Sequence, residues 1–324
     1  MTIILTDPKI KTLVFFNMTI NENLSSFNHR KIVDFKGKIS FLKFIYRISI
    51  NKDNEEGGFD ALFQKYCDNP ITTQTKELVI GAWFNTISYK NDSTKLVDLL
   101  IQNKDKLPKL EYLFLGDITY QECEMSWINQ CDVSPLLAAY PQLKHFQVRG
   151  GNGLSFGSLH HTSLETLIVE TGGMDRQTLI EIANATLPNL KHLELWLGNK
   201  NYGWTGTLED LQPFLSGDHF PKLTYLGLKN SEISDEIARA LNNASILDGL
   251  EVLDLSMGTL GDKGAQALLA NPKITQLKSL ILRHHYISEE LSAKLSKLPC
   301  QVDLSDPVGN PVGDEDDRYV EVGE

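Results

Sequence analysis

The sequence contains few cysteines and no long apolar run, and both absences limit the class of protein. Its four cysteines form no CxxC pair and no spacing typical of a disulfide framework, which favours a reducing, intracellular setting. No window approaches the run of about 18 apolar residues that a membrane-spanning helix requires. The apolar stretch at 12–20 lacks the small-residue cleavage pattern of a signal peptide. We therefore expect a soluble, cytoplasmic protein without a membrane partner.

An excess of basic residues is also missing. The chain has 31 Lys and Arg against 42 Asp and Glu, a net charge of −11 at pH 7. Residues 303–324 hold eight acids and one base, Arg318, so this segment carries −7 and the rest of the chain −4. Because contact with phosphates requires a basic surface, we expect no nucleic-acid partner.

Signatures of catalysis are absent as well. The sequence has no GxSxG or HExxH motif. The glycine-rich stretch RGGNGLSFG at 149–157 has neither the lysine of a phosphate-binding loop nor dinucleotide spacing. Cys123 and Cys131 lie near acidic residues, which raise a thiol pKa and disfavour a nucleophile. We expect no enzyme, no catalytic residue and no cofactor.

What the sequence does contain is a repeated phrase. The pattern Leu-x-x-Leu-x-Leu recurs, for example as LPKLEYLFL at 107–115, LPNLKHLEL at 187–195 and FPKLTYLGL at 220–228. Successive copies are separated by 21 to 35 residues. With insertions, these steps fit the period of about 20 to 29 residues of leucine-rich repeats. The equivalent apolar residues are Leu78, Leu113, Phe146, Leu167, Leu193, Leu226, Leu253 and Leu280.

This repeat predicts the fold. Each Leu-x-Leu forms a short strand whose leucines point inward, and the strands stack in parallel, one per repeat. The return segments at 231–244 and 258–272 carry apolar residues at helical spacing. We predict an α/β leucine-rich-repeat solenoid, a horseshoe with a parallel sheet on the concave face and helices on the convex face. Long helical returns favour a wide, ribonuclease-inhibitor-like curve.

Three regions are expected along the chain. Residues 1–74 lack the repeat and are interpreted as an N-terminal cap that continues the sheet. Residues 75–304 form an array of about eight repeats. Residues 305–324 are rich in acids, Pro and Gly and are predicted to be a flexible tail, although Tyr319, Val320 and Val322 could dock it locally.

Individual stretches of the sequence are more specific than the repeat period. LFLGDITYQECEMSWINQCDVSPLL at 113–137, ELWLGNKNYG at 194–203 and LDLSMGTLGDKGAQALL at 253–269 resemble a bacterial cytoplasmic leucine-rich-repeat family often encoded beside radical-SAM proteins. The resemblance covers roughly residues 75–324, including the end RYVEVGE, and weakens toward the N-terminus. It implies a recognition or scaffold subunit in a small modification system, and it brings no catalytic residues.

The concave face is the expected binding surface. Side chains between, before and just after the paired leucines form columns about 4.8 Å apart on this face. The residues predicted for partner binding are Tyr112, Phe114, Gln147, Arg149, Glu170, Glu194, Trp196, Tyr225, Lys229, Asp254 and Arg283. Exposed aromatics flanked by arginines are typical of protein interface anchors. In the alternative, Arg149 and Glu170 only pair across neighbouring strands and the aromatics pack on loops.

Several loop residues and histidines also suggest sites. Acidic residues surround Trp127, where a cation could bind, or Trp127 could be a core plug below solvated acids. The stretch at 199–204 is interpreted either as a partner loop or as a turn with an aromatic lid. His145 and His192 are two strands, about 10 Å, apart, which does not supply a zinc ligand set. We expect no metal.

These observations predict a non-catalytic scaffold that binds a protein or peptide of unknown identity with its concave face. A different hypothesis is an accessory subunit that presents substrate to a radical-SAM peptide-modifying enzyme. The first depends on the concave residues, and the second depends on the family resemblance.

Overall fold

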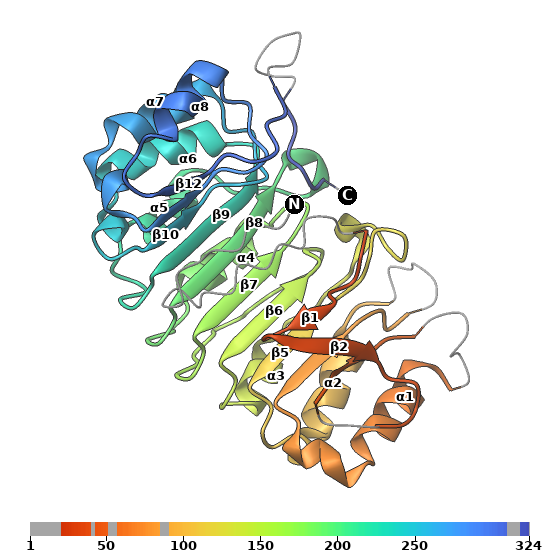
Figure 1. Ribbon diagram of the computed structural model, residues 1–324. Helices are drawn as coiled ribbons and strands as arrows, with labels where there is room; N and C mark the ends of the chain where they lie inside the picture. The colour runs from red at the N-terminus through yellow and green to blue at the C-terminus, as the bar shows by residue number, and fades with distance from the viewer. Residues whose placement is uncertain (1–20, 40–42, 51–56, 85–90, 310–317, 324) are drawn as a thin grey trace.

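The computed structural model describes residues 21–39, 43–50, 57–84, 91–309 and 318–323. Within these ranges the chain forms one sheet whose twelve strands follow one another in sequence order (Figure 1). β1 pairs antiparallel with β2, and each later pair is parallel. The strands are β1 (Ser26–Phe27), β2 (Arg30–Asp34), β3 (Ile45–Ile48), β4 (Glu77–Ile80), β5 (Tyr112–Leu115), β6 (His145–Arg149), β7 (Thr166–Glu170), β8 (His192–Gly198), β9 (Tyr225–Ser231), β10 (Val252–Asp254), β11 (Ser279–Ile281) and β12 (Gln301–Asp303).

The register of the sheet follows the repeat. Leu113 pairs with Leu78 on one side and with Phe146 on the other. The same row continues from strand to strand through the other equivalent residues as far as Leu280, which pairs with Val302. Alternation along each strand sends this row into the solenoid. The leucine-rich-repeat fold predicted from the sequence is confirmed.

Helices and short 3-10 turns form the return segments on the other side of the sheet (Figure 1). Each of the two predicted helical returns contains a helix, α6 (Ser234–Ala240) in the first and α7 (Asp262–Ala270) in the second. Small and apolar side chains recur there at helical spacing. In the described residues the helices are α1 (Gly58–Cys67), α2 (Thr94–Gln102), α3 (Ser134–Ala139), α4 (Arg176–Ala183), α5 (Gln212–Leu215), α6 (Ser234–Ala240), α7 (Asp262–Ala270) and α8 (Glu289–Leu295).

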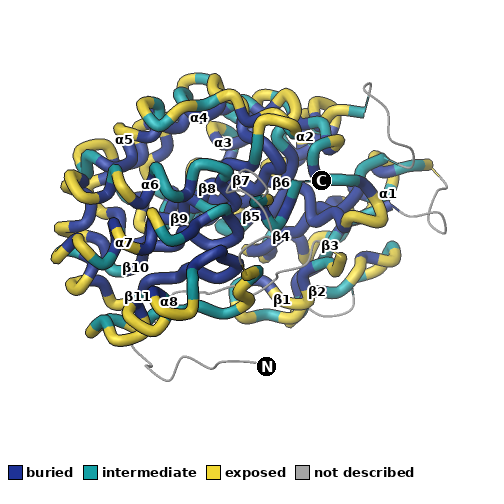
Figure 2. Tube along the Cα trace, turned by 90° about the horizontal axis from the view of Figure 1, so that it is seen from above, coloured by how far each residue is buried: buried dark blue, intermediate teal, exposed yellow. Residues whose placement is uncertain are grey.

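The core lies between these two layers. One continuous cluster of buried side chains extends from Phe35 to Leu295 and contains the leucine row. Figure 2 shows buried residues along the inside of the arc and exposed residues on its outer turns. Since a fully buried Leu contributes about 1.5–3 kcal/mol, stacking of successive repeats stabilises strands that are too short to persist alone.

The two ends of the described chain add structure beyond the repeats. β2 and β3 extend the sheet before β4, in the region where a cap is expected. Beyond β12, residues 318–323 return to the sheet edge at the ends of the strands (Figure 1). We call Arg318–Gly323 the tail segment. Among the described residues, no helix has the length and apolar character needed to cross a membrane.

Candidate binding surface on the concave face

The sheet brings the predicted binding residues together. Arg149 of β6 is aligned with Glu170 of β7, and Trp196 of β8 is aligned with Lys229 of β9. Neighbouring strands lie about 4.8 Å apart, so aligned side chains are within reach of one another. Residues that the sequence places in one column therefore lie next to one another in the structure.

Their expected exposure is wrong for three of the four aromatic residues. Phe114 is 0% exposed, Trp196 5% and Tyr225 6%, and Tyr112 is half-buried. Of the polar residues, Lys229 is half-buried and the others are buried, namely Gln147, Arg149, Glu170, Glu194, Asp254 and Arg283. Packing with distant segments of the chain and pairing within the face account for much of this burial.

One of these segments contains β1 and the residues just before it. Phe27 and Leu24 belong to a buried cluster with Phe114, and the ring centroids of Phe27 and Tyr112 are 6.4 Å apart. The backbone N–H of Leu24 donates to both carboxylate oxygens of the fully buried Asp117 at 3.2 Å. Phe114 is consequently part of the core and does not present its ring to a partner.

The second segment is the tail segment. Val322 packs in a buried cluster with Trp196, Met125 and Met257. Glu321 accepts a hydrogen bond from Nη2 of Arg283 at 2.6 Å. Two residues predicted to contact a partner thus contact a segment of the same chain.

Arg149 and Glu170 form a buried pair. Arg149 Nε donates to Glu170 Oε2 at 2.6 Å, and the other carboxylate oxygen accepts from Gln147 Nε2 at 2.5 Å. Arg149 Nη1 also donates to the carbonyl oxygen of Ile118 at 2.7 Å. The pairing across neighbouring strands that the sequence allowed is confirmed. Its charges are hydrogen-bonded, as burial requires.

A second charged group centres on Glu194. Its carboxylate accepts from the indole Nε1 of Trp196 at 2.7 Å and from Lys229 Nζ at 3.0 Å. Tyr225 donates its hydroxyl to Asp254 at 2.7 Å. Burial raises the pKa of Glu194, but the charge of Lys229 and the hydrogen bonds outweigh it, so the pKa is lowered. Burial lowers the pKa of Lys229, yet Glu194 and Asp254 raise it above its usual value.

The two histidines of this face, His145 and His192, pack against aromatic rings. The imidazole of His192 stacks on the ring of Tyr225, with centroids 3.7 Å apart. Burial lowers the pKa of His145 to about 3. In the described part of the chain, no three His, Cys, Asp or Glu side chains are grouped so that they could hold a metal ion.

The two conspicuous loops differ from each other. Trp127 is 44% exposed, so its interpretation as a core plug is wrong. Trp204 is buried, and Asn199 caps the turn before it by accepting from the backbone N–H of Asn201. The stretch at 199–204 is therefore a turn with a buried aromatic, as one of the two alternatives proposed.

The pKa values of the Cys123 and Cys131 thiols are raised, as predicted, but burial is a larger cause than the acidic neighbours. Burial, followed by the charges of Glu124 and Glu122, raises the pKa of Cys123 to about 11. Burial is also the main cause of the raised pKa of Cys131. A raised pKa keeps a thiol protonated at neutral pH and unreactive as a nucleophile.

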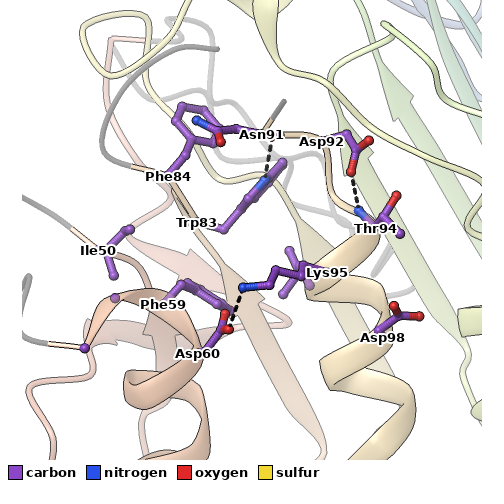
Figure 3. A pocket seen from close by; sticks show the side chains of 13 residues that line it. Ile50, Phe59, Asp60, Trp83, Phe84, Asn91, Asp92, Thr94, Lys95 and Asp98 are labelled. Atoms are coloured by element: carbon purple, nitrogen blue, oxygen red, sulfur yellow. Dashed lines mark hydrogen bonds and ion pairs between the residues drawn. The ribbon is translucent and has the colours of Figure 1, made fainter. Parts of the chain in front are cut away.

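A pocket of about 540 Å³ lies outside the concave face, between the start of α1 and the start of α2 (Figure 3). Phe59, Trp83 and Phe84 supply apolar walls. Lys95 Nζ is paired with Asp60 at 3.0 Å, and Trp83 Nε1 donates to the carbonyl oxygen of Asn91 at 3.2 Å. Its volume suits a small ligand, but the ammonium of Lys95 and the indole N–H of Trp83 are already engaged within the wall.

A second pocket of about 420 Å³ lies at the ends of β6, β7 and β8. Glycines form much of its wall, including Gly151, Gly172 and Gly173. These positions require glycine, because a Cβ on Gly173 would lie 2.5 Å from the carbonyl oxygen of Tyr202. A Cβ on Gly172 would meet the oxygen of Gly323 at 2.5 Å, so this pocket adjoins the tail segment.

Sequence reasoning missed several residues that build this surface. Three of them occupy the same position in successive repeats, 27 residues apart: Asn230, Met257 and His284. Each has a left-handed backbone, with φ of 54°, 70° and 55° respectively. Such a conformation is uncommon without glycine. Each of the three contacts the tail segment. Their regular spacing was the available signal, and only the structure reveals the shared conformation.

One solved structure shares this architecture over most of the chain. No protein-family model matches the chain, and no curated protein matches it. A protein from Bacteroides fragilis, solved as a structural genomics target, superposes with a TM-score of 0.79 at 32% identity, over 86% of this chain and 77% of that chain. An internalin from Listeria monocytogenes aligns with a TM-score of 0.39 at 18% identity, over 74% of this chain and 57% of that chain.

The parallel ladder, the in-register leucine row and the helical returns define a leucine-rich-repeat protein. Within this class, identity and coverage show that the chain belongs to the same family as the Bacteroides fragilis protein.

Proposed function

We propose that the protein is a non-catalytic, cytoplasmic scaffold that binds a protein or an extended peptide along its concave face and the adjoining strand ends. The tail segment is the observation that supports this proposal. It places Val322 against Trp196 and Glu321 against Arg283, two of the residues predicted for partner binding. Repeat solenoids generally use such extended surfaces for binding proteins. The proposal requires neither a metal nor a cofactor.

Exposed aromatic residues offer outer contacts for the same partner. Tyr120 and Trp127 are 43% and 44% exposed in the loop that follows β5. Met125, between them, is buried against Trp196 and Val322, which holds this loop against the concave side. Aromatic residues are enriched in protein interfaces relative to the rest of the surface.

Affinity purification from the native cell, followed by mass spectrometry, tests this proposal. Wild type is compared with a Tyr120→Ala, Trp127→Ala double variant and with Ile71→Ala, an exposed apolar control of similar accessibility. We expect one protein to co-purify with wild type and with the control and to be lost from the double variant. All three baits must give the same cooperative thermal transition. Recovery of identical proteins with all three would exclude this loop from binding.

The family resemblance supports a second, narrower function. A scaffold that holds a peptide could present it to a radical-SAM peptide-modifying enzyme. This function predicts that such an enzyme co-purifies with the wild-type chain in stoichiometric amount. A partner set that contains no radical-SAM protein would leave the general scaffold intact and reject the accessory-subunit function.

A further inference from the structure

The tail segment is held mainly through its backbone. Tyr286 contacts both backbone groups of Tyr319, since its hydroxyl accepts from the N–H at 3.1 Å and donates to the carbonyl oxygen at 3.0 Å. Asn230 does the same at Val322, where Nδ2 donates to the carbonyl oxygen at 2.5 Å and Oδ1 accepts from the N–H at 2.9 Å. These contacts depend on a peptide backbone and not on one particular sequence.

A third backbone contact lies between these two. The N–H of Glu321 donates to the carbonyl oxygen of Met257 at 2.8 Å. Met257 and Asn230 both have the left-handed backbone described above. Met257 directs its backbone carbonyl at the tail segment, and Asn230 directs its side-chain amide at it. Unfavourable backbone conformations of this kind gather at ligand-binding sites. Three separate repeats thus each supply one peptide-binding group.

Side-chain contacts add a sequence preference. Arg283 is 4% exposed and forms an ion pair with Glu321. The apolar cluster that includes Trp196 receives Val322. At the other end of the segment, Asp235 pairs with Arg318 at 3.2 Å. The groove therefore fits a peptide with a basic residue, an acidic residue three positions later, and an apolar residue directly after that.

The glycine-lined pocket continues the groove. Gly323 lies against Gly172, and Tyr202 both lines the pocket and contacts Gly323. The pocket, of about 420 Å³, is also bordered by Ser126 and Asn152.

We propose that this groove, formed by Trp196, Asn230, Met257, Arg283 and Tyr286, is a peptide-binding site that the tail segment occupies as a competitor. A partner carries an extended peptide of the same pattern, basic-aromatic-apolar-acidic-apolar, and displaces the tail segment to bind. This inference rests on the scaffold function proposed above and adds its ligand class and its regulation.

A fluorescence-anisotropy titration with the full chain tests the proposal. The probe is a labelled peptide with the sequence of residues 318–323, Arg-Tyr-Val-Glu-Val-Gly. The chain is wild type or carries Glu321→Lys and Val322→Asp, which weaken its own tail segment. We expect the weakened-tail chain to bind the probe about tenfold more tightly than wild type, because the competitor is removed. Adding Asn230→Ala to the weakened-tail chain should reverse this gain.

Controls separate groove binding from other effects. A probe with Lys and Asp at its fourth and fifth positions should bind the weakened-tail chain at least about thirtyfold less tightly, as expected for loss of a buried charge pair and an apolar contact. Circular dichroism must show that the weakened-tail chain is folded and unfolds cooperatively. If the chain with Glu321→Lys and Val322→Asp does not fold, a chain with Val322→Ala takes its place in the same comparison. Equal binding of both probes, or no binding to a folded weakened-tail chain, would overturn the proposal.

Size-exclusion chromatography of the wild-type chain completes the test. A monomer is expected, because the tail segment occupies its own groove. A dimer that dissociates when the tail segment is changed would instead assign the groove to a second copy and refute a partner peptide. Tyr120 and Trp127 are not groove residues, and the peptide titration does not change them. Loss of the partner in the pull-down and loss of probe binding can therefore occur separately, so the scaffold function and this inference can fail separately.

Discussion

At the scale of single residues, the concave face is organised by buried, paired charges. Arg149 and Glu170 share a hydrogen bond and are each about 5% exposed. A charge of this kind is tolerated only while its partner is present, since an unpaired buried carboxylate retains the full cost of its desolvation. An exposed ion pair of the same residue types lacks this dependence.

Arg149→Met should therefore lower the free energy of unfolding by about 3–5 kcal/mol, because Glu170 is left buried without its partner. A double change, Arg149→Met with Glu170→Leu, should recover more than half of the loss. Urea unfolding followed by circular dichroism measures both. The control is Arg239→Met, whose exposed pair with Glu236 should contribute less than about 1 kcal/mol. Equal losses for Arg149→Met and the control would contradict the buried-pair interpretation.

At the scale of elements, β1 covers part of the concave face around Phe114. β1 has two residues and one strand neighbour, so its own ladder holds it weakly. Its attachment depends on Phe27, which is 1% exposed against Phe114, and on the bond from Leu24 to Asp117. Burial of Phe27 is the aromatic link between this segment and the concave face, beside the hydrogen bonds of Asn23 and Leu24 to Asp117.

Phe27→Ala should cost about 3–5 kcal/mol of unfolding free energy, the usual cost of emptying a buried aromatic site. It should also accelerate hydrogen exchange at the amide of Ile32, which donates to the carbonyl oxygen of Ser25. The neighbouring change Ser26→Ala, at an exposed position, serves as control and should alter neither quantity. If the two variants exchange and unfold alike, the turn is not held by Phe27.

At the scale of the whole molecule, buried histidines make stability depend on pH. Burial is the largest cause that lowers the pKa of each of four residues, namely His145, His161, His284 and His285. The unfolded chain binds protons near pH 6.5, the usual histidine pKa, while the folded chain resists them. Stability is therefore complete above that pH and declines as the pH falls.

For His145 the decline extends from about pH 6.5 to its folded pKa of about 3. This residue should contribute a slope of about 1.4 kcal/mol per pH unit within that range. Urea unfolding at a series of pH values between about 7.5 and 4.5 measures the slope. His145→Phe keeps an aromatic ring beside Phe27 but cannot titrate, so the slope should become shallower by that amount. An unchanged slope would show that His145 does not cause the loss.

The leucine-rich-repeat fold follows from local features of the sequence. The period-two alternation in each Leu-x-Leu and the recurrence from Leu78 to Leu280 are local features, and they set which side chains face the core. The pairing of Arg149 with Glu170 could also be predicted, because aligned repeats place these two residues on neighbouring strands.

Which concave side chains stay accessible depends on contacts between distant parts of the chain. Asp117 binds Leu24 from 93 residues away, and Asn230 binds Val322 from 92 residues away. No local period encodes such contacts, so a column that looks exposed in the repeat, such as that of Trp196, is buried in the molecule. Trp127 shows the reverse, because its loop has no repeat to define an inner face. Periodic patterns specify a repeat and its neighbours, whereas the segment around β1 and the tail segment contact residues far away in the sequence that only the folded molecule brings together.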